Sequence, residues 1–165
     1  MISLEELNPR RFELVARWLS NPEINRWLTA EWRGRAVTAP VIAMAVRNPR
    51  NRMFVILYDE QPCGLVALAD IDRSDKTAMV WYFLGEATLG RKGITSEAVR
   101  QLARFAFREL MLASLYAWVM EDNRGSHQVL QKAGFALAGR IRNATHSGER
   151  QVDRVYYDLI AEPCP

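Results

Sequence analysis

The spacing of hydrophobic residues predicts one long helix in the second half of the chain. Apolar residues fall four apart at Ile94, Ala98, Leu102, Ala106 and Leu110, while arginine and glutamine lie mainly on the opposite side. A period of about 3.6 residues, with one apolar stripe and one polar face, is typical of an amphipathic helix packed against a core. This stretch is therefore expected to be a helix with one buried face.

Shorter apolar runs before this helix predict strands. They span residues 53–58, 63–71 and 78–84, and polar turns at 59–62 and 72–76 separate them. Short runs bounded by turn residues are typical of strands joined by hairpins. The three runs predict an antiparallel meander that leads into the long helix.

Helix caps and chain breakers delimit the other predicted elements. The N-terminal part is expected to hold a short strand and three helices, at residues 2–4, 8–20, 22–28 and 36–46. The C-terminal part is expected to hold three strands, one helix and one loop, at 114–120, 135–141, 152–160, 126–133 and 143–148. This order predicts a mixed α/β layer, in which the strands on either side of the long helix run parallel.

Length and composition favour a single domain, residues 1–165, with an ordinary hydrophobic core. The formal net charge of +3 is too small to indicate nucleic-acid binding. The two cysteines, Cys63 and Cys164, lie far apart and have no metal-binding spacing. A signal-peptide pattern and a bilayer-spanning apolar run are both absent from the sequence. We therefore expect a cytoplasmic protein that binds no metal, nucleic acid or membrane.

A glycine-containing basic loop joins the apolar run at 78–84 to the long helix. It carries Gly90 and Gly93 around the cations Arg91 and Lys92. The first N–H groups of a helix have no partner inside the helix, and the helix dipole favours an anion there. The loop therefore indicates a phosphate site, although a tight left-handed turn between strand and helix would use the same glycines.

Several motifs resemble those of one known family. The segments 82–85 (YFLG) and 90–98 (GRKGITSEA) resemble the acetyl-CoA loop of the GNAT acetyltransferases. Residues 123–135 resemble the fourth motif of that family, N-x-x-S-x-x-V-L-x-K-x-G-F. The segments 18–24 and 148–157 are similar to the beginning and the closing strand of its ribosomal-protein (RimJ/RimL-like) branch.

This resemblance implies a fold and an activity. The fold would be a mixed, mostly antiparallel sheet of six to seven strands, with helices on both faces and one splayed parallel strand pair. The activity would be acetyl-CoA-dependent N-acetyl transfer to a primary amine, by direct attack of the amine on the thioester. The acceptor would be a small amine, such as an amino sugar, or a protein N-terminus. The chain would be a monomer or a homodimer.

The resemblance also implies which residues hold coenzyme A. They are Phe83, Leu84, Leu89, Gly90, Arg91, Lys92, Gly93, Ile94, Thr95, Asn123 and Ser126. The loop departs from the usual pattern, because Gly90 takes its first place, Thr95 takes its last, and it looks one residue longer. Main-chain N–H groups would still cradle a diphosphate, since that contact does not depend on side chains.

Two catalytic residues are candidates. The resemblance places Ser126 near the thioester sulfur as a proton donor, although serine is also a favoured helix N-cap. Tyr82 would hold a water chain or simply pack in the core. The glutamate and tyrosine common in this family are replaced by Met79 and Leu130. His127 is expected to point to solvent.

The sequence does not identify the general base. Asp70, Asp72 and Glu31 are candidates that would act through water, and the two aspartates are equally typical of turn caps. Because the usual acid and base are absent, an alternative function stays open. The chain would then be a non-catalytic acyl-CoA-binding domain that senses or recruits a partner.

An aromatic and basic segment is the candidate wall of the acceptor site. It contains Trp27, Glu31, Trp32 and Arg33, followed by Arg35. Aromatic faces suit a sugar or a peptide, and arginine suits phosphate or carboxylate. The segment weakly favours a small, anionic acceptor, although a partly buried core and a solvated face would have the same composition.

Overall fold

A computed structural model describes residues 1–90 and 92–162. Its strands are β1 (Ile2–Glu6), β2 (Arg52–Tyr58), β3 (Gln61–Asp72), β4 (Thr77–Leu84), β5 (Ser114–Met120), β6 (Ala136–Ser147) and β7 (Arg150–Ile160). Its α-helices are α1 (Phe12–Ser20), α2 (Pro22–Asn25), α3 (Ala39–Arg47), α4 (Ile94–Arg108) and α5 (Arg124–Lys132). Two short 3₁₀ helices are η1 (Pro9–Arg11) and η2 (Ala87–Leu89).

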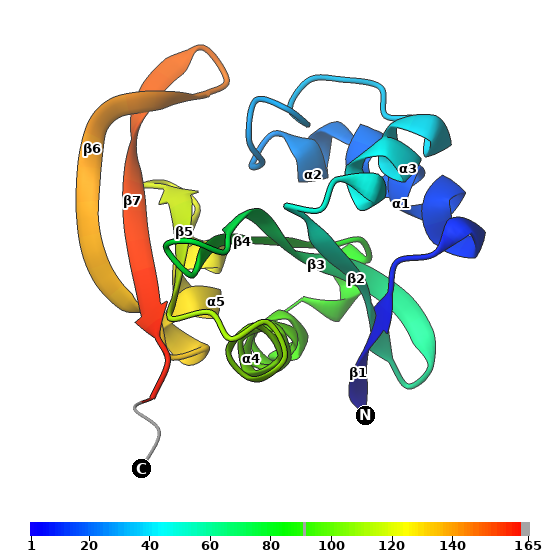
Figure 1. The fold of residues 1–165 in the computed structure, drawn as a ribbon. Coiled ribbons are helices and arrows are strands. Elements are labelled where there is room, and N and C mark those ends of the chain that lie inside the picture. The colour runs from blue at the N-terminus through cyan, green and yellow to red at the C-terminus, as the bar shows by residue number, and fades with distance from the viewer. Residues whose placement is uncertain (91, 163–165) are drawn as a thin grey trace.

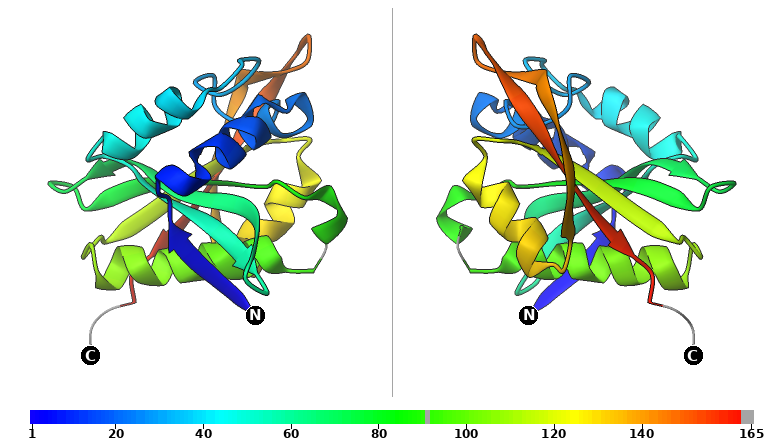
Figure 2. Two further views of the ribbon diagram at one scale, coloured as in Figure 1. Left: turned by 90° about the vertical axis from the view of Figure 1, so that its right-hand side faces the viewer. Right: turned by 90° about the vertical axis from the view of Figure 1, so that its left-hand side faces the viewer.

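The strands form one seven-stranded sheet in the order β1-β2-β3-β4-β5-β7-β6. The β4–β5 pair is parallel, and the other neighbours are antiparallel. Helices α1 to α3 cover one face, and α4 and α5 lie on the other (Figures 1 and 2). The predicted mixed sheet with helices on both faces is therefore confirmed.

Helix α4 buries the stripe predicted from its sequence. Ile94, Ala98, Leu102 and Ala106 are at most 2% exposed and belong to the core between this helix and the sheet. A second core lies under α1 and α3 on the opposite face. None of the helices in the described ranges is long and apolar enough to cross a bilayer.

The parallel pair is short, and this shapes the site. Strand β4 pairs with β5 only from Thr77 to Met79. Beyond that point β4 keeps its pairing with β3 up to Leu84, while β5 keeps its pairing with β7 up to Met120. The sheet therefore divides into two halves from Val80 onward. From the sequence alone the strands would be expected to splay only beyond Leu84, because local apolar runs carry no information about which neighbour each residue pairs with.

The β6–β7 hairpin corrects a further prediction. The segment 143–148 was expected to be a loop, but β6 continues through it as far as Ser147. Thr145 pairs with Val152, and the register shifts between Ile141 and Thr145, where Asn143 has a φ of 49°. A local bulge in a continuous strand thus has the composition of a loop.

Candidate active site

A cavity of about 790 Å³ lies where the two halves of the sheet diverge. Three segments that are far apart in the chain form much of its wall, namely residues 82–84, 93–96 and 123–126. They belong to the end of β4, the start of α4 and the start of α5, which lie close together in Figure 2. The structure therefore brings the two family-like motifs of the sequence to one place.

The first main-chain N–H groups of α4 border this cavity. The N–H groups of Ile94, Thr95 and Ser96 have no acceptor among residues 1–90 and 92–162, and the first N–H of the helix to be paired is that of Glu97. Gly93 precedes them with a φ of 74°, and a Cβ built on it meets no atom within 4 Å. Donors at the positive end of a fifteen-residue helix could hold an anion such as a diphosphate.

Only some residues of the loop before α4 border the cavity. Leu89 and Gly90 line the cavity. Lys92 is exposed, and its Nζ lies 5.4 Å from the centre of the Tyr58 ring, so this cation is directed toward β2. Arg91, the other predicted cation, lies outside the described residues.

The free edge of β4 forms a second wall. Its residues from Val80 to Leu84 pair with β3 on one side only, because β5 has moved away on the other. Phe83 is buried in the core beneath α1 and borders the cavity next to Leu84. An open strand edge of this kind can accept an extended ligand that carries amide groups.

Ser126 and Asn123 lie at the start of α5. The side-chain oxygen of Asn123 accepts a hydrogen bond from the Ser126 N–H at 3.2 Å, so Asn123 is the N-cap. The alternative reading of Ser126 as that cap is therefore wrong, because the helix begins two residues earlier than predicted. The Ser126 hydroxyl makes no hydrogen bond to any described residue and borders the cavity, so it is available to a ligand.

Tyr82 connects the two sides of the divergence. Its hydroxyl donates a hydrogen bond to the main-chain oxygen of Ser126 at 3.2 Å. Burial raises the pKa of this phenol well above its ordinary value, with a smaller opposing effect from the hydrogen bond to Ser126. Tyr82 therefore stays neutral and can only donate or accept hydrogen bonds near neutral pH.

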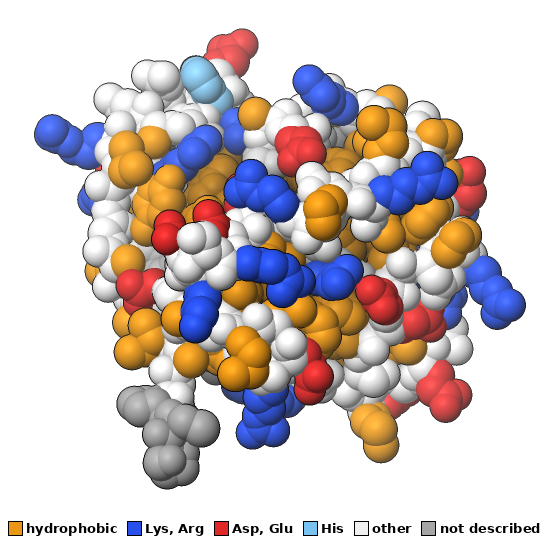
Figure 3. Space-filling view, in the orientation of Figure 1, with side chains coloured by type: hydrophobic (Ala, Val, Ile, Leu, Met, Phe, Trp, Pro, Cys, Tyr) orange, Lys and Arg blue, Asp and Glu red, His pale blue; other side chains and the backbone are white. Residues whose placement is uncertain are grey.

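A smaller hollow of about 40 Å³ adjoins this cavity. The residues that line both this hollow and the larger cavity are Trp27, Leu28, Tyr82, Asn123 and Ser126. Its other lining residues are mostly aromatic or apolar and include Trp32, Met79, Trp81 and Trp118. The two spaces thus share one set of side chains. Figure 3 shows hydrophobic side chains between the β6–β7 hairpin and the N-terminal helices, with Lys and Arg nearby.

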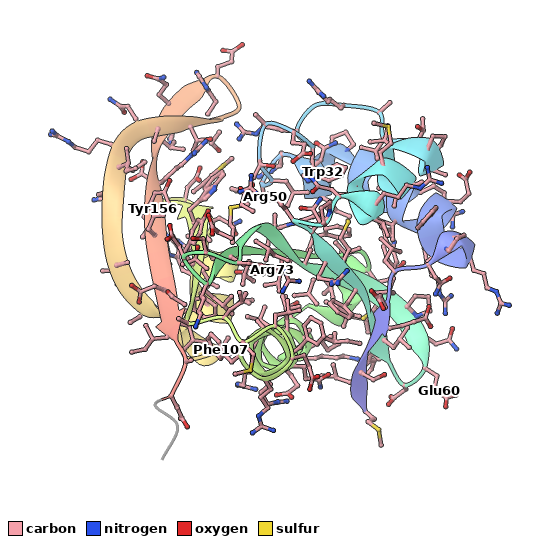
Figure 4. All side chains as sticks on the ribbon, viewed as in Figure 1. Trp32, Arg50, Glu60, Arg73, Phe107 and Tyr156 are labelled. Atoms are coloured by element: carbon pink, nitrogen blue, oxygen red, sulfur yellow. The ribbon has the colours of Figure 1, made fainter. Side chains whose placement is uncertain are left out.

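The predicted acceptor residues divide into two groups. Trp27 and Trp32 line the hollow, and Trp32 stacks on Trp81 with ring centres 5.5 Å apart. In Figure 4, Trp32 and Tyr156 lie on opposite sides of the space between the N-terminal helices and the hairpin. Glu31 is exposed and lines neither space.

Arg33 is held by the protein itself. Its guanidinium donates to the main-chain oxygens of Leu28 and His146 and to the hydroxyl of Thr145, at 3.2, 3.0 and 3.1 Å. Burial lowers the pKa of Arg33, and the positive charge of Arg154 lowers it further. Arg33 therefore ties the segment after α2 to the tip of the hairpin.

The candidate bases lie in turns and bulges. Asp70 has a φ of 52° where the β3 register is interrupted, and its carboxylate lies 3.7 Å from Arg50. Asp72 accepts hydrogen bonds from the N–H groups of Ser74 and Asp75. Neither aspartate lines the cavity or the hollow. The turn-cap reading of Asp72 is the one that its contacts support.

His127 does not point freely to solvent as expected. It is half-buried, with Nδ1 2.8 Å from the Tyr157 hydroxyl and Nε2 3.2 Å from the main-chain oxygen of Glu121. Leu130 is fully buried, which leaves no polar group at that place.

Several lining residues were missed by the sequence analysis. Ile24 and Leu28 come from the segment around α2, while Val129 and Lys132 come from α5. The α5 pair follows Ser126 at intervals of three, so helical spacing in the quoted motif was a usable signal. No local pattern marks Ile24 or Leu28, because only the tertiary fold places them at the cavity.

Comparison with known proteins identifies a family and several relatives that match large parts of the chain. The acetyltransferase (GNAT) domain family matches residues 2–136. The putative ribosomal N-acetyltransferase YdaF of Bacillus subtilis (strain 168) is 31% identical over 105 residues, which cover 64% of this chain and 57% of YdaF. The probable N-acetyltransferase YjcK of the same organism is 46% identical over 85 residues, covering 51% of this chain and 46% of YjcK. The aligned segments thus span about half the length of these two relatives.

A solved structure has the same fold. Spermidine N-acetyltransferase from Vibrio cholerae, in complex with CoA and spermine, superposes with a TM-score of 0.85 at 16% identity, covering 96% of this chain and 95% of that one. At this level of identity the likeness concerns the fold alone.

Proposed function

Since the chain belongs to the GNAT acetyltransferase family, we propose that it is an acetyl-CoA-dependent N-acetyltransferase that acts on a primary amine. Its similarity to a protein named as a putative ribosomal N-acetyltransferase agrees with the RimJ/RimL-like branch. One observation carries the proposal: three features border a single cavity. They are the first N–H groups of α4 and the Ser126 hydroxyl, which have no partner among the described residues, and the edge of β4 beyond its pairing with β5.

The residues around this cavity fit coenzyme A. A cavity of about 790 Å³ lies within the range of cofactor sites. The amides of Gly93 to Ser96 would hold the diphosphate, and main-chain groups of Tyr82 to Leu84 would pair with the amide-containing arm. Leu89, Gly90 and Asn123 complete this proposed site. Acetyl-CoA would supply an acetyl group activated as a thioester.

The chain itself would supply protons and orientation. The Ser126 Oγ–H has no competing partner among the described residues, so it is free to donate to a leaving thiolate. Tyr82 would fix the main chain of Ser126 and order water at the point where the two spaces share lining residues. The base would be water, or a carboxylate acting through water.

The amine would enter through the smaller hollow. Trp32 would form one wall of this entry, together with Trp27, which also borders the cofactor cavity. A small amine or a protein N-terminus would satisfy this arrangement. We further propose that residues 1–165 act as one domain, as a monomer or homodimer, in the cytoplasm.

A thiol-release assay with a panel of primary amines tests the proposal. We expect acetyl-CoA-dependent thiol release with at least one amine, and a fall of about tenfold or more in kcat for Ser126→Ala. Coenzyme A affinity should be unchanged in this variant, and Ser3→Ala on β1 is the matched control. Cofactor binding without turnover on any amine would instead support the non-catalytic acyl-CoA-binding domain.

A further inference from the structure

Arg154 of β7 is a cation without a partner among the described residues. Its Nε is buried, and its guanidinium forms no ion pair or hydrogen bond with any of them. The guanidinium carbon lies 4.0 Å from the centre of the Trp118 ring on the neighbouring strand β5. Stacking on an indole orients the guanidinium but does not satisfy its N–H groups.

The neighbouring carboxylates do not neutralise Arg154. Asp153 accepts from Arg140 Nε at 2.9 Å and, by strand alternation, lies on the opposite face of β7. Asp158 lies on the same face but four residues further along β7, opposite Tyr116, and forms no ion pair with Arg154. The Nη groups of Arg154, which unlike Nε are not buried, would therefore be the donors that an anion from outside the chain meets.

A second arginine increases the positive charge at this place. Arg33 bonds to Thr145, whose partner in the hairpin is Val152, two residues before Arg154 on the same face of β7. All of the hydrogen bonds that Arg33 forms are to neutral oxygens, so its charge is also uncompensated. Two half-buried arginines without a carboxylate favour an anionic ligand.

The position of Arg154 connects this charge to the proposed reaction. The Trp118 ring on which it stacks lines the hollow together with Tyr82 and Ser126. Tyr156, two residues from Arg154, pairs with Trp118 across the strands and faces the space shown in Figure 4. A group bound to Arg154 would therefore lie beside the proposed entry of the amine.

We propose that Arg154, held against Trp118, binds an anionic group, a carboxylate or a phosphate, on the acceptor amine. The planar fork of arginine suits either group in a bidentate arrangement. The claim that this ligand is the acceptor rests on the proposed acetyl transfer. The claim that Arg154 binds an anion does not.

Calorimetry in the presence of coenzyme A tests the binding directly. The probes are inorganic phosphate and two matched pairs, glucosamine 6-phosphate with glucosamine and alanine with alaninamide. We expect the anionic member of at least one pair to bind about tenfold more tightly than its neutral partner, and Arg154→Gln to remove this preference. Arg108→Gln removes the same charge at the far end of α4 and should leave the preference intact.

One further variant and an acetylation assay make the test decisive. Arg154→Lys keeps the charge without the fork, so an intermediate preference in a folded variant supports the proposal. Equal binding of both members by the wild type, or an Arg154→Gln variant that retains the preference, would overturn it. If binding depends on Arg154 but no amine is acetylated, the transferase proposal fails and the anion site stands. Faster turnover of spermidine than of every anionic amine would overturn the acceptor assignment.

Discussion

The hydroxyl of Tyr82 on β4 and the main-chain oxygen of Ser126 on α5 are joined by a hydrogen bond of 3.2 Å. This bond spans the divergence of the sheet, where β4 and β5 no longer pair. It places the one polar side-chain atom of Tyr82 beside the start of α5, and it relies on a phenol that burial keeps protonated. The contact therefore couples the geometry of the site to the protonation of one buried group.

Replacing Tyr82 by phenylalanine should change how stability depends on pH. Because burial raises the pKa of Tyr82, the folded chain keeps the phenol proton at a pH where the unfolded chain releases it. The free energy of unfolding should therefore fall as the pH rises above the ordinary phenol pKa of about 10. Urea unfolding at several alkaline pH values should show a shallower fall for Tyr82→Phe than for the wild type. Equal slopes would contradict this account of Tyr82.

Gly93 allows a comparison with a glycine of similar conformation. Gly93 and Gly148 have φ values of 74° and 62°, and a Cβ on either meets no atom within 4 Å. Alanine at either position should cost about 1 kcal/mol of folding stability, because the left-handed region is unfavourable for it. Only Gly93→Ala should weaken coenzyme A binding, by about tenfold or more, since its methyl group would occupy the space beside the α4 amides. Calorimetric titration of both variants measures this; equal affinities would count against the placement of the diphosphate.

Arg33 should matter for stability through its hydrogen bonds. Arg33→Gln loses most of the bonds that join the segment after α2 to Thr145 and His146. A loss of about 2 kcal/mol in the free energy of unfolding is expected, given about 0.5 to 1.5 kcal/mol for each bond. Arg35→Gln, at an exposed position nearby, is the matched control. Denaturant unfolding compares the two variants, and a similar effect in both would reject the role of Arg33 as a tie.

Gly85 at the end of β4 should tolerate no side chain. A Cβ at this position would lie 2.3 Å from a ring atom of Trp18, which is itself buried. Gly85→Ala should therefore destabilise the fold by about 2 kcal/mol or more, through overpacking. Gly139→Ala on β6, where a Cβ meets nothing within 4 Å, should change stability by less than about 0.5 kcal/mol. Thermal unfolding of both variants provides the measurement.

The sequence predicted those parts of the fold that depend on local pattern. The 3.6-residue period from Ile94 gives α4, and the short apolar runs give β2, β3 and β4, because burial on one side leaves a period in the sequence. The prediction of a loop near Asn143 was wrong, since the polar composition there belongs to a bulge in a strand, and pairing with β7 is what keeps the strand continuous.

The candidate site was predictable only where a motif is contiguous. Gly93, Ser126 and the residues beside them were found because each lies in a short, family-like run. The residues of the proposed acceptor side were harder to predict, since Trp118 and Arg154 meet only when β5 and β7 pair. Arg33 lies in a segment whose aromatic and basic composition suggests ligand binding, yet its side chain bonds to the β6–β7 hairpin. A single sequence gives no indication of that contact.

The most direct test of the central claim is hydrogen exchange of the main-chain amides with and without coenzyme A. The N–H groups of Ile94, Thr95 and Ser96 have no acceptor among the described residues, so they should exchange readily in the free protein. Coenzyme A should slow their exchange, together with that of amides between Val80 and Leu84. Protection confined to other segments, or none at all at saturating coenzyme A, would contradict the proposed site.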